Sequence, residues 1–176
     1  LNFNIYPFAN LTESDALMTS HCLYKSFDDI PSTLSHVLLT EVLREQMGFN
    51  GLIVSDGMEM KAIADHYGIG NGCVMALNAG CDILLLCHKY SEQKEAFECV
   101  KRAVLNGTLS VDLLKEKAER INKAKQRLIS KLNENFNEED YIVNKDEHNI
   151  MQEIVDNSYT CVLGNAPYLD NNTLII

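Results

Sequence analysis

A short apolar strand that ends on an aspartate constrains this chain more than any other feature. The run Leu52-Ile53-Val54 is followed by Ser55-Asp56 and then by a helical pattern, so a strand meets a helix through a carboxylate. In α/β proteins, residues at the carboxyl end of a strand and in the next loop face the substrate. The pattern therefore makes Asp56 the first candidate for chemistry.

The same residues also fit an ordinary helix start. Ser55 or Asp56 could be the N-cap of the following helix, and Glu59, three residues after Asp56, would complete a capping box. Local pattern alone leaves both interpretations open.

Three apolar runs alternate with helical stretches along the chain. Strands are predicted at residues 16–22, 52–55 and 83–87, because each run is short and is bounded by turn or capping residues. Strands that alternate with helices indicate a parallel sheet. The fold class is therefore α/β.

Glycines mark where the helices between these strands end. Leucine and valine residues recur at helical spacing over residues 34–43, and Gly48 stands where a C-terminal glycine is expected. Residues 57–79 are predicted to form two shorter helices with a turn near Ile69. A further helix is predicted over 92–105, and another opens with Ser110 as its N-cap.

Several segments around Asp56 resemble one known family. These segments are Tyr6-Pro7-Phe8, the run 15–21, the run 31–35, the run 48–56, the run 60–68 and the run 76–86. Together they resemble family 3 glycoside hydrolases over most of residues 5 to 130, and 48–56 matches the segment that carries the catalytic nucleophile. The pattern Ser55-Asp56-x-x-x-Met60 is most similar to the β-N-acetylhexosaminidase branch.

The resemblance implies a particular architecture. Residues 1–132 would be the C-terminal portion, about the last three β/α units, of a TIM (β/α)₈ barrel, which as a whole needs about 250 residues. We expect a chain truncated at its N-terminus, and Leu1 in place of Met fits this. Residues 133–145 are expected to be a linker, and 146–176 a helix and the start of a C-terminal α/β domain.

The resemblance also implies a chemistry, retaining hydrolysis of terminal β-linked N-acetylhexosamine through a covalent glycosyl-enzyme on Asp56. The acid/base of this branch is a histidine paired with an aspartate on a loop that would precede Leu1. We therefore expect the chain alone to be inactive. No cofactor and no metal are implied.

Three residues at strand ends are candidates for substrate contacts: His21, Tyr24 and Met60. His21 could instead be a structural histidine bonded to the backbone, and Met60 could be ordinary core. His88, after the third strand, could support the site from behind.

Charge and cysteine content limit the function classes. The net charge is −10, so the lysine-rich helix after Ser110 is predicted to be a solvated face and not a nucleic-acid surface. The six cysteines form no Cys-x-x-Cys pair, which favours buried reduced thiols and a cytoplasmic location, with a secreted form as the alternative. No membrane segment is visible in the sequence.

Alternatives to this function remain open. A family 3 β-glucosidase and a non-catalytic remnant of such an enzyme would show the same motifs. Asp56, Glu59, Asp65, His66 and His21 could instead hold a divalent metal, although no ligand spacing of the His-Glu-x-x-His kind appears. The expected partner is a carbohydrate, an N-acetylglucosamine-containing glycan or muropeptide from peptidoglycan turnover.

Overall fold

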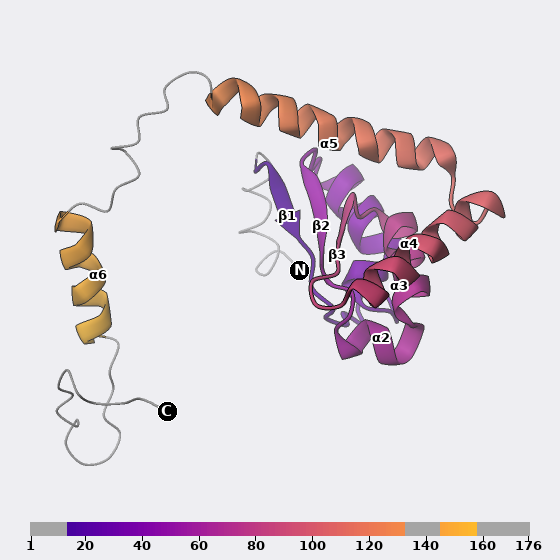
Figure 1. The fold of residues 1–176 in the computed structure, drawn as a ribbon, viewed down its shortest axis with the longest axis horizontal. Coiled ribbons are helices and arrows are strands. Elements are labelled where there is room, and N and C mark those ends of the chain that lie inside the picture. The colour runs from indigo at the N-terminus through magenta and orange to yellow at the C-terminus, as the bar shows by residue number, and fades with distance from the viewer. Residues whose placement is uncertain (1–13, 133–144, 158–176) are drawn as a thin grey trace, which may run out of the picture. The chain divides into compact units, whose positions relative to one another are not determined.

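Three parallel strands form the sheet of this chain, with the helices of residues 61–105 to one side of it (Figure 1). The computed structural model describes residues 14–132 and 145–157. The sheet has the order β1 (Ala16–Met18), β2 (Leu52–Gly57) and β3 (Ile83–Leu85), and both neighbouring pairs are parallel. The predicted α/β class and parallel sheet are confirmed.

The strand ends differ from the predicted ones. β1 and β3 are shorter than expected, because the backbone leaves the sheet after Met18 and after Leu85. β2 is longer and continues through Asp56 to Gly57. Asp56 is therefore the penultimate residue of the strand and does not follow it.

Helices connect the strands and continue after them. They are the 3₁₀-helix η1 (Ser32–Leu34), the π-helix η2 (Val37–Gln46), and the α-helices α2 (Lys61–Tyr67), α3 (Ile69–Ala79), α4 (Tyr90–Leu105) and α5 (Val111–Leu132). The predicted pair of helices within 57–79 is confirmed, with Gly68 between them at φ 74°. Gly48 has φ 71°, as expected after a helix C-terminus.

The helix predicted over 34–43 is wrong in detail. Leu34 belongs to η1, and the following ten residues form a π-helix whose end is marked by the Met47 N–H donating to the Val42 carbonyl at 2.9 Å. A π-helix keeps one apolar stripe much as an α-helix does, so the leucine spacing does not distinguish them. Leu39 and Leu43 are buried as that stripe requires.

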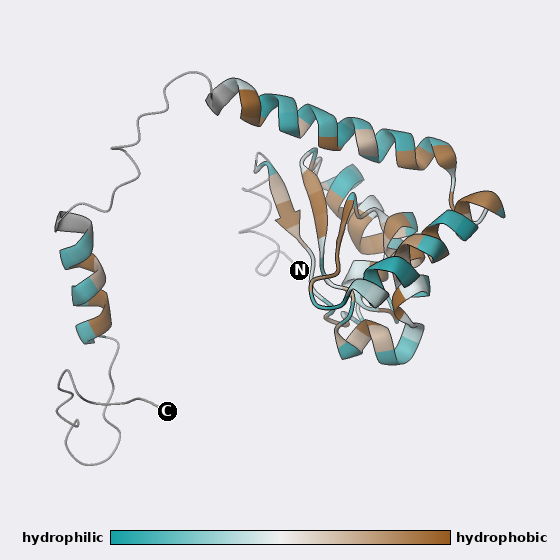
Figure 2. Ribbon diagram, in the orientation of Figure 1, coloured by the Kyte–Doolittle hydropathy of each residue, from teal (hydrophilic) through white to brown (hydrophobic). Residues whose placement is uncertain are grey.

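One face of the sheet packs on the helices. Ile53 of β2 is 0% exposed and belongs to a core that includes Leu39 and Leu43 of η2 and Cys73 of α3. The strands are strongly hydrophobic, whereas α4 and α5 mix apolar and polar residues (Figure 2). Helix α3 contacts β3 of the sheet, and α4 packs on α3.

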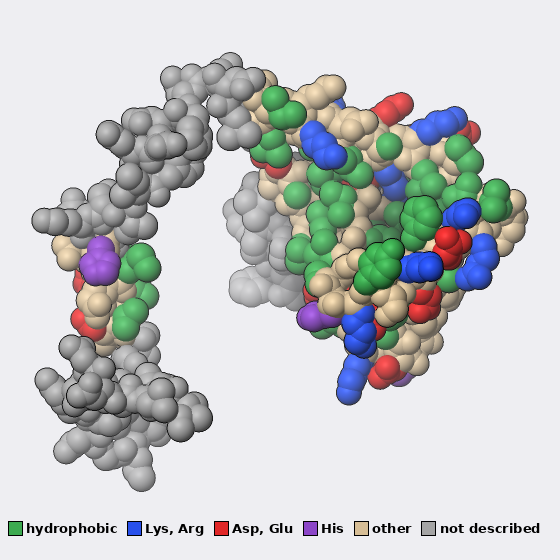
Figure 3. All heavy atoms as spheres, in the orientation of Figure 1, with side chains coloured by type: hydrophobic (Ala, Val, Ile, Leu, Met, Phe, Trp, Pro, Cys, Tyr) green, Lys and Arg blue, Asp and Glu red, His purple; other side chains and the backbone are tan. Residues whose placement is uncertain are grey.

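The opposite face of the sheet carries apolar side chains that no described helix covers. Hydrophobic side chains gather over the strands on the face shown in Figure 3, and Met18 of β1 is 60% exposed. On β2 the buried residues Ile53 and Ser55 alternate with the partly exposed Leu52 and Val54. Both faces of the sheet therefore carry apolar side chains, but described helices cover only one of them.

Helix α5 lies across the end of the sheet at which the strands begin (Figure 1). Arg120 and Arg127 of this helix pair with Asp82 and Asp15, which precede β3 and β1. The Ser110 hydroxyl accepts the N–H groups of Asp112 and Leu113 at 3.2 and 3.5 Å, which confirms the predicted N-cap.

A separate helix, α6 (Lys145–Asn157), belongs to a second compact unit, residues 132–176. It exposes an apolar stripe that includes Ile150 and Ile154. The strand-like runs expected at 158–163 and 173–176, and most of the expected linker, lie outside the described residues. No helix in the described ranges is both long and apolar enough to cross a membrane.

Candidate active site

A β-bulge shapes the end of β2. Val54 pairs with Ile83 and Gly57 pairs with Leu85, so three steps on β2 face two steps on β3. The Leu85 N–H donates to the buried Ser55 hydroxyl at 2.9 Å, so this side chain takes a place in the ladder. Bulges bend a strand and re-aim its side chains, and they are common next to active sites.

Asp56 lies in this bulge at the carboxyl end of the sheet. It is partly exposed, and its Oδ1 accepts the Gly57 N–H at 2.8 Å. Helix α2 begins at Lys61, and its N-cap is Met60, which makes no capping side-chain bond. The helix-cap interpretation of Ser55 and Asp56 is therefore wrong.

His21 reaches the peptide that follows Asp56. Its Nε2 lies 2.9 Å from the Gly57 carbonyl oxygen, and its Nδ1 lies 2.9 Å from the Thr33 hydroxyl. The carbonyl can only accept, so Nε2 donates to it, while Thr33 Oγ1 donates its single proton to the Ser20 carbonyl at 2.9 Å. Both ring nitrogens are occupied, which matches the structural alternative for His21. In this arrangement His21 positions the end of β2.

Removal of His21 is expected to destabilise the fold. His21→Ala leaves the Gly57 carbonyl without this donor and removes one of the contacts of the buried Thr33 hydroxyl, which costs about 1–2 kcal/mol. Urea unfolding of the chain measures the loss, with His66→Ala on the exposed surface of α2 as control. Equal unfolding midpoints for the two variants would contradict the positioning role.

The other two predicted substrate contacts, Tyr24 and Met60, are both exposed. Tyr24 is 50% exposed and lines a cavity of about 450 Å³ between β1, the loop after it and η2. The residues lining that cavity do not include Asp56, His21 or Met60. Met60 is 47% exposed in the loop after β2, so it is not ordinary core.

The Glu59 carboxylate and the His88 imidazole form a pair near the carboxyl end of β2, which the sequence did not predict. Glu59 Oε1 accepts the Cys87 N–H at 3.0 Å and lies 2.7 Å from His88 Nδ1. Burial raises the pKa of Glu59, but hydrogen bonds from its own N–H, from Cys87 and from His88 outweigh this and leave the pKa below its ordinary value. His88 therefore pairs directly with an ionised carboxylate.

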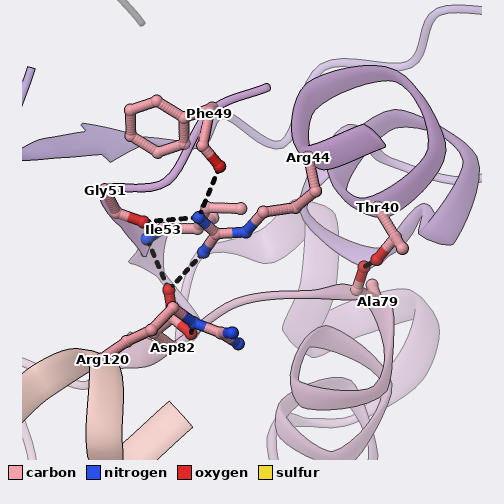
Figure 4. Close-up of polar contacts among 8 residues, drawn as sticks. All are labelled: Thr40, Arg44, Phe49, Gly51, Ile53, Ala79, Asp82 and Arg120. Carbon is pink, nitrogen blue, oxygen red and sulfur yellow. Dashed lines mark hydrogen bonds and ion pairs between the residues drawn. The ribbon is translucent and has the colours of Figure 1, made fainter. Parts of the chain in front are cut away.

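A second charged cluster lies at the opposite end of the sheet, where the strands begin (Figure 4). The carboxylate of Asp82 is 0% exposed and accepts Arg44 Nη2 at 2.6 Å, Arg120 Nε at 2.9 Å and the Ile53 N–H at 2.9 Å. In β/α barrels this end serves stability and not catalysis. Asp82 therefore links η2, β2 and α5 through hydrogen bonds and ion pairs.

The prediction that the basic helix is wholly solvated is wrong at Lys117 of α5. Lys117 is 2% exposed, and its Nζ has no hydrogen-bond partner among the described residues. Burial lowers its pKa; Asp82 opposes this shift and Arg120 adds to it. A buried amine of this kind costs stability while it is charged.

Lys117→Met is expected to stabilise the fold by about 1 kcal/mol at neutral pH. The folded-state pKa of Lys117 lies below the ordinary 10.5, so the unfolded chain binds more protons between the two values and stability rises with pH across that interval. The methionine variant should lack this rise. Urea unfolding at several pH values measures it, with the exposed Lys115→Met as control. Parallel pH profiles for wild type and Lys117→Met would contradict the assignment.

The cysteines are only partly as predicted. Cys73 and Cys81 are buried, and burial raises the pKa of each thiol to about 12, so they are inert. Cys22 and Cys87 are exposed, which contradicts the prediction for these two. Cys161 lies outside the described residues.

The described residues show no cluster of side chains that would support the metal alternative. Within residues 14–132 and 145–157, no group of three or more histidine, cysteine, aspartate or glutamate side chains is placed to hold a metal ion. Of the residues considered for it, His21 bonds a carbonyl and a hydroxyl, and Glu59 bonds His88.

Comparison with known proteins decides the family. The family model described as the glycosyl hydrolase family 3 N terminal domain matches residues 2–124. The chain belongs to glycoside hydrolase family 3. Its relatives include the beta-hexosaminidases of Hydrogenovibrio crunogenus and Tolumonas auensis, which are 42% identical to it over 87 and 88 residues respectively, in both cases 48% of this chain. These matches cover 24% and 26% of the relatives, so the chain spans about a quarter of their length.

Solved structures also resemble this chain, and one of them is described as a glycoside hydrolase of family 3. The beta-N-acetylglucosaminidase from Paenibacillus sp. superposes with a TM-score of 0.75 and 30% identity over 93% of this chain and 32% of that one. The beta-N-acetylglucosaminidase from Thermotoga maritima gives a TM-score of 0.65 and 31% identity over 69% of this chain and 28% of that one. The predicted family is confirmed, and the relatives and solved structures named here are called beta-hexosaminidases or beta-N-acetylglucosaminidases.

Proposed function

We propose that this chain is part of a retaining β-N-acetylglucosaminidase that cleaves terminal β-linked N-acetylhexosamine, with Asp56 as the nucleophile. The observation that carries the proposal is the position of Asp56, partly exposed in a bulge at the carboxyl end of a parallel strand. The names of the relatives, beta-hexosaminidase and beta-N-acetylglucosaminidase, support the choice of sugar.

The proposed reaction has two steps. The Asp56 carboxylate attacks the anomeric carbon as the leaving-group oxygen departs, which forms a glycosyl ester on Asp56. Water then attacks the same carbon and releases the sugar with net retention. The Gly57 N–H, which Asp56 Oδ1 accepts at 2.8 Å, leaves Oδ2 as the oxygen free to attack and fixes the orientation of the carboxylate.

The sheet itself is proposed to be the last part of a TIM (β/α)₈ barrel, about three β/α units. Helices pack on one face, while the other face carries partly exposed apolar residues such as Met18 and Val54. In a closed barrel that second face is the packed interior. The apolar inner face of the sheet is therefore explained if further strands close the barrel.

The acid/base is proposed to come from a histidine and aspartate outside the residues of this chain, as the family resemblance implies. A general acid/base contributes about 10²–10⁴ in rate. The 176-residue chain on its own is then inactive, and activity needs the upstream strands or a complementing chain. The natural substrate is proposed to be an N-acetylglucosamine-containing glycan or muropeptide of peptidoglycan turnover.

An assay of two proteins tests the proposal. One is the 176-residue chain, and the other, the extended protein, is this chain preceded by the upstream strands of a relative's barrel. The extended protein should cleave a chromogenic N-acetyl-β-glucosaminide in preference to a β-glucoside. Preference for the glucoside would instead indicate a family 3 β-glucosidase, and cleavage of neither would favour a non-catalytic remnant.

A further inference from the structure

The loops after β2 and β3 are joined by Glu59 and His88 at the carboxyl end of the sheet. The Glu59 carboxylate lies against Gly57, since a Cβ built there would be 3.3 Å from Glu59 Oε2. Gly57 directly follows Asp56, and it pairs with Leu85 at the end of β3. The pair therefore lies beside the proposed nucleophile, on the two loops that a sugar bound there would meet.

The two partners differ strongly in exposure. The Glu59 side chain is 11% exposed and the His88 side chain is 77% exposed. The buried carboxylate is held by the Cys87 N–H, whereas the imidazole projects from the loop. Glu59 is thus the fixed member of the pair, and His88 is the member that can meet a ligand.

The hydrogen bond sets which ring nitrogen of His88 is available. An ionised carboxylate only accepts, so the 2.7 Å contact requires a proton on Nδ1. In the neutral ring the lone pair is then on Nε2, the nitrogen that Glu59 leaves free. Glu59 Oε2 is buried and has no hydrogen-bond partner among the described residues, a condition that native structures keep at few places.

We propose that Glu59 holds His88 as the Nδ1–H tautomer, so that His88 Nε2 accepts a hydrogen bond from a hydroxyl of the sugar that Asp56 attacks. His88 is then a substrate-contacting residue and Glu59 a positioning residue. This inference rests on the glycosidase activity proposed above. It assigns to the β3–α4 loop a role in sugar recognition that neither the bulge nor the Ser-Asp-x-x-x-Met pattern contains.

Kinetics of the extended protein test the contact. His88→Ala should lower kcat/KM for the N-acetyl-β-glucosaminide about tenfold, mainly through KM, because one hydrogen bond to a bound hydroxyl is lost. His88→Gln places an amide oxygen near the position of Nε2 and should recover most of the loss. Glu59→Gln should lower kcat/KM several-fold even though His88 is present. His36→Ala is the matched control, because His36, which precedes η2, forms an exposed pair at 3.6 Å with Glu41 of that helix.

Imidazole ¹⁵N spectra of the 176-residue chain test the tautomer without any activity. The wild type should show the neutral His88 ring protonated at Nδ1, and Glu59→Gln should move the proton toward Nε2. A merely structural pair would leave kcat/KM unchanged in the variants. His88 is highly exposed, so thermal unfolding should be similar for wild type and His88→Ala.

The outcomes separate the two proposals. If the extended protein is active, Asp56→Asn removes activity and both His88→Ala and Glu59→Gln have wild-type kcat/KM, the recognition role is overturned and the glycosidase remains. A wild-type neutral ring protonated at Nε2 would also overturn the recognition role. If the extended protein cleaves no glycoside, both proposals fall together.

Discussion

Asp56→Asn in the extended protein is expected to lower kcat on an N-acetyl-β-glucosaminide on the order of 10³-fold or more. The amide has no negative charge and is not a nucleophile toward an anomeric carbon, so the covalent step is lost. Its carbonyl oxygen can still accept the Gly57 N–H that Asp56 Oδ1 accepts at 2.8 Å. The loss should therefore appear in activity with little change in stability.

Two comparisons make this result specific. Asp65→Asn, on the exposed surface of α2 nine residues later, should keep wild-type kinetics. With an activated fluorinated substrate, mass spectrometry of the wild type should detect a glycosyl adduct on the peptide that contains Asp56, and the asparagine variant should show none. Full activity of Asp56→Asn, or an adduct on another residue, would exclude Asp56 as the nucleophile.

The position of the candidate nucleophile was predictable because it depends on local sequence. Leu52-Ile53-Val54 is an apolar run that can only be a strand in this context, and Ser55-Asp56 ends it. The bulge was not predictable, since it arises from the offset between β2 and β3 and from the Ser55 hydroxyl bonding the Leu85 N–H. The sequence of β2 alone does not show at which residue its pairing with β3 shifts.

Long-range polar pairs account for most of what the sequence did not show. Glu59 and His88 are 29 residues apart, and Arg44 and Asp82 are 38 apart. Each of these residues looks like an ordinary surface charge when it is considered with its neighbours in sequence. The burial of Lys117 is hidden in the sequence for the same reason, since its helical spacing matches that of solvated lysines while the packing of α5 buries it.

Asp82→Ala is expected to destabilise the first unit by about 3–5 kcal/mol. The carboxylate is fully buried and accepts Arg44, Arg120 and the Ile53 N–H, so its removal leaves two cations and a strand amide without their shared acceptor. Asp112→Asn removes an exposed ion pair with Lys115 and should cost at most about 1 kcal/mol. Urea unfolding of the 176-residue chain measures both, and similar midpoints would contradict a structural role for Asp82.

Asp82→Asn separates the charge of this group from its shape. The amide fills the same space, and its oxygen in the place of Oδ2 can still accept from Ile53 and Arg44, but its NH₂ group then faces the Arg120 Nε–H where Asp82 has an acceptor. If charge neutralisation dominates, the asparagine variant should lose nearly as much stability as Asp82→Ala. If the hydrogen bond to Ile53 dominates, most stability should remain.

Lys117 sharpens the comparison, because without the carboxylate three cations lie together and its amine loses the charge that favours protonation. Lys117→Met should therefore recover more stability in the Asp82→Asn background than in the wild type, and additive effects of the two substitutions would show that the groups are not coupled.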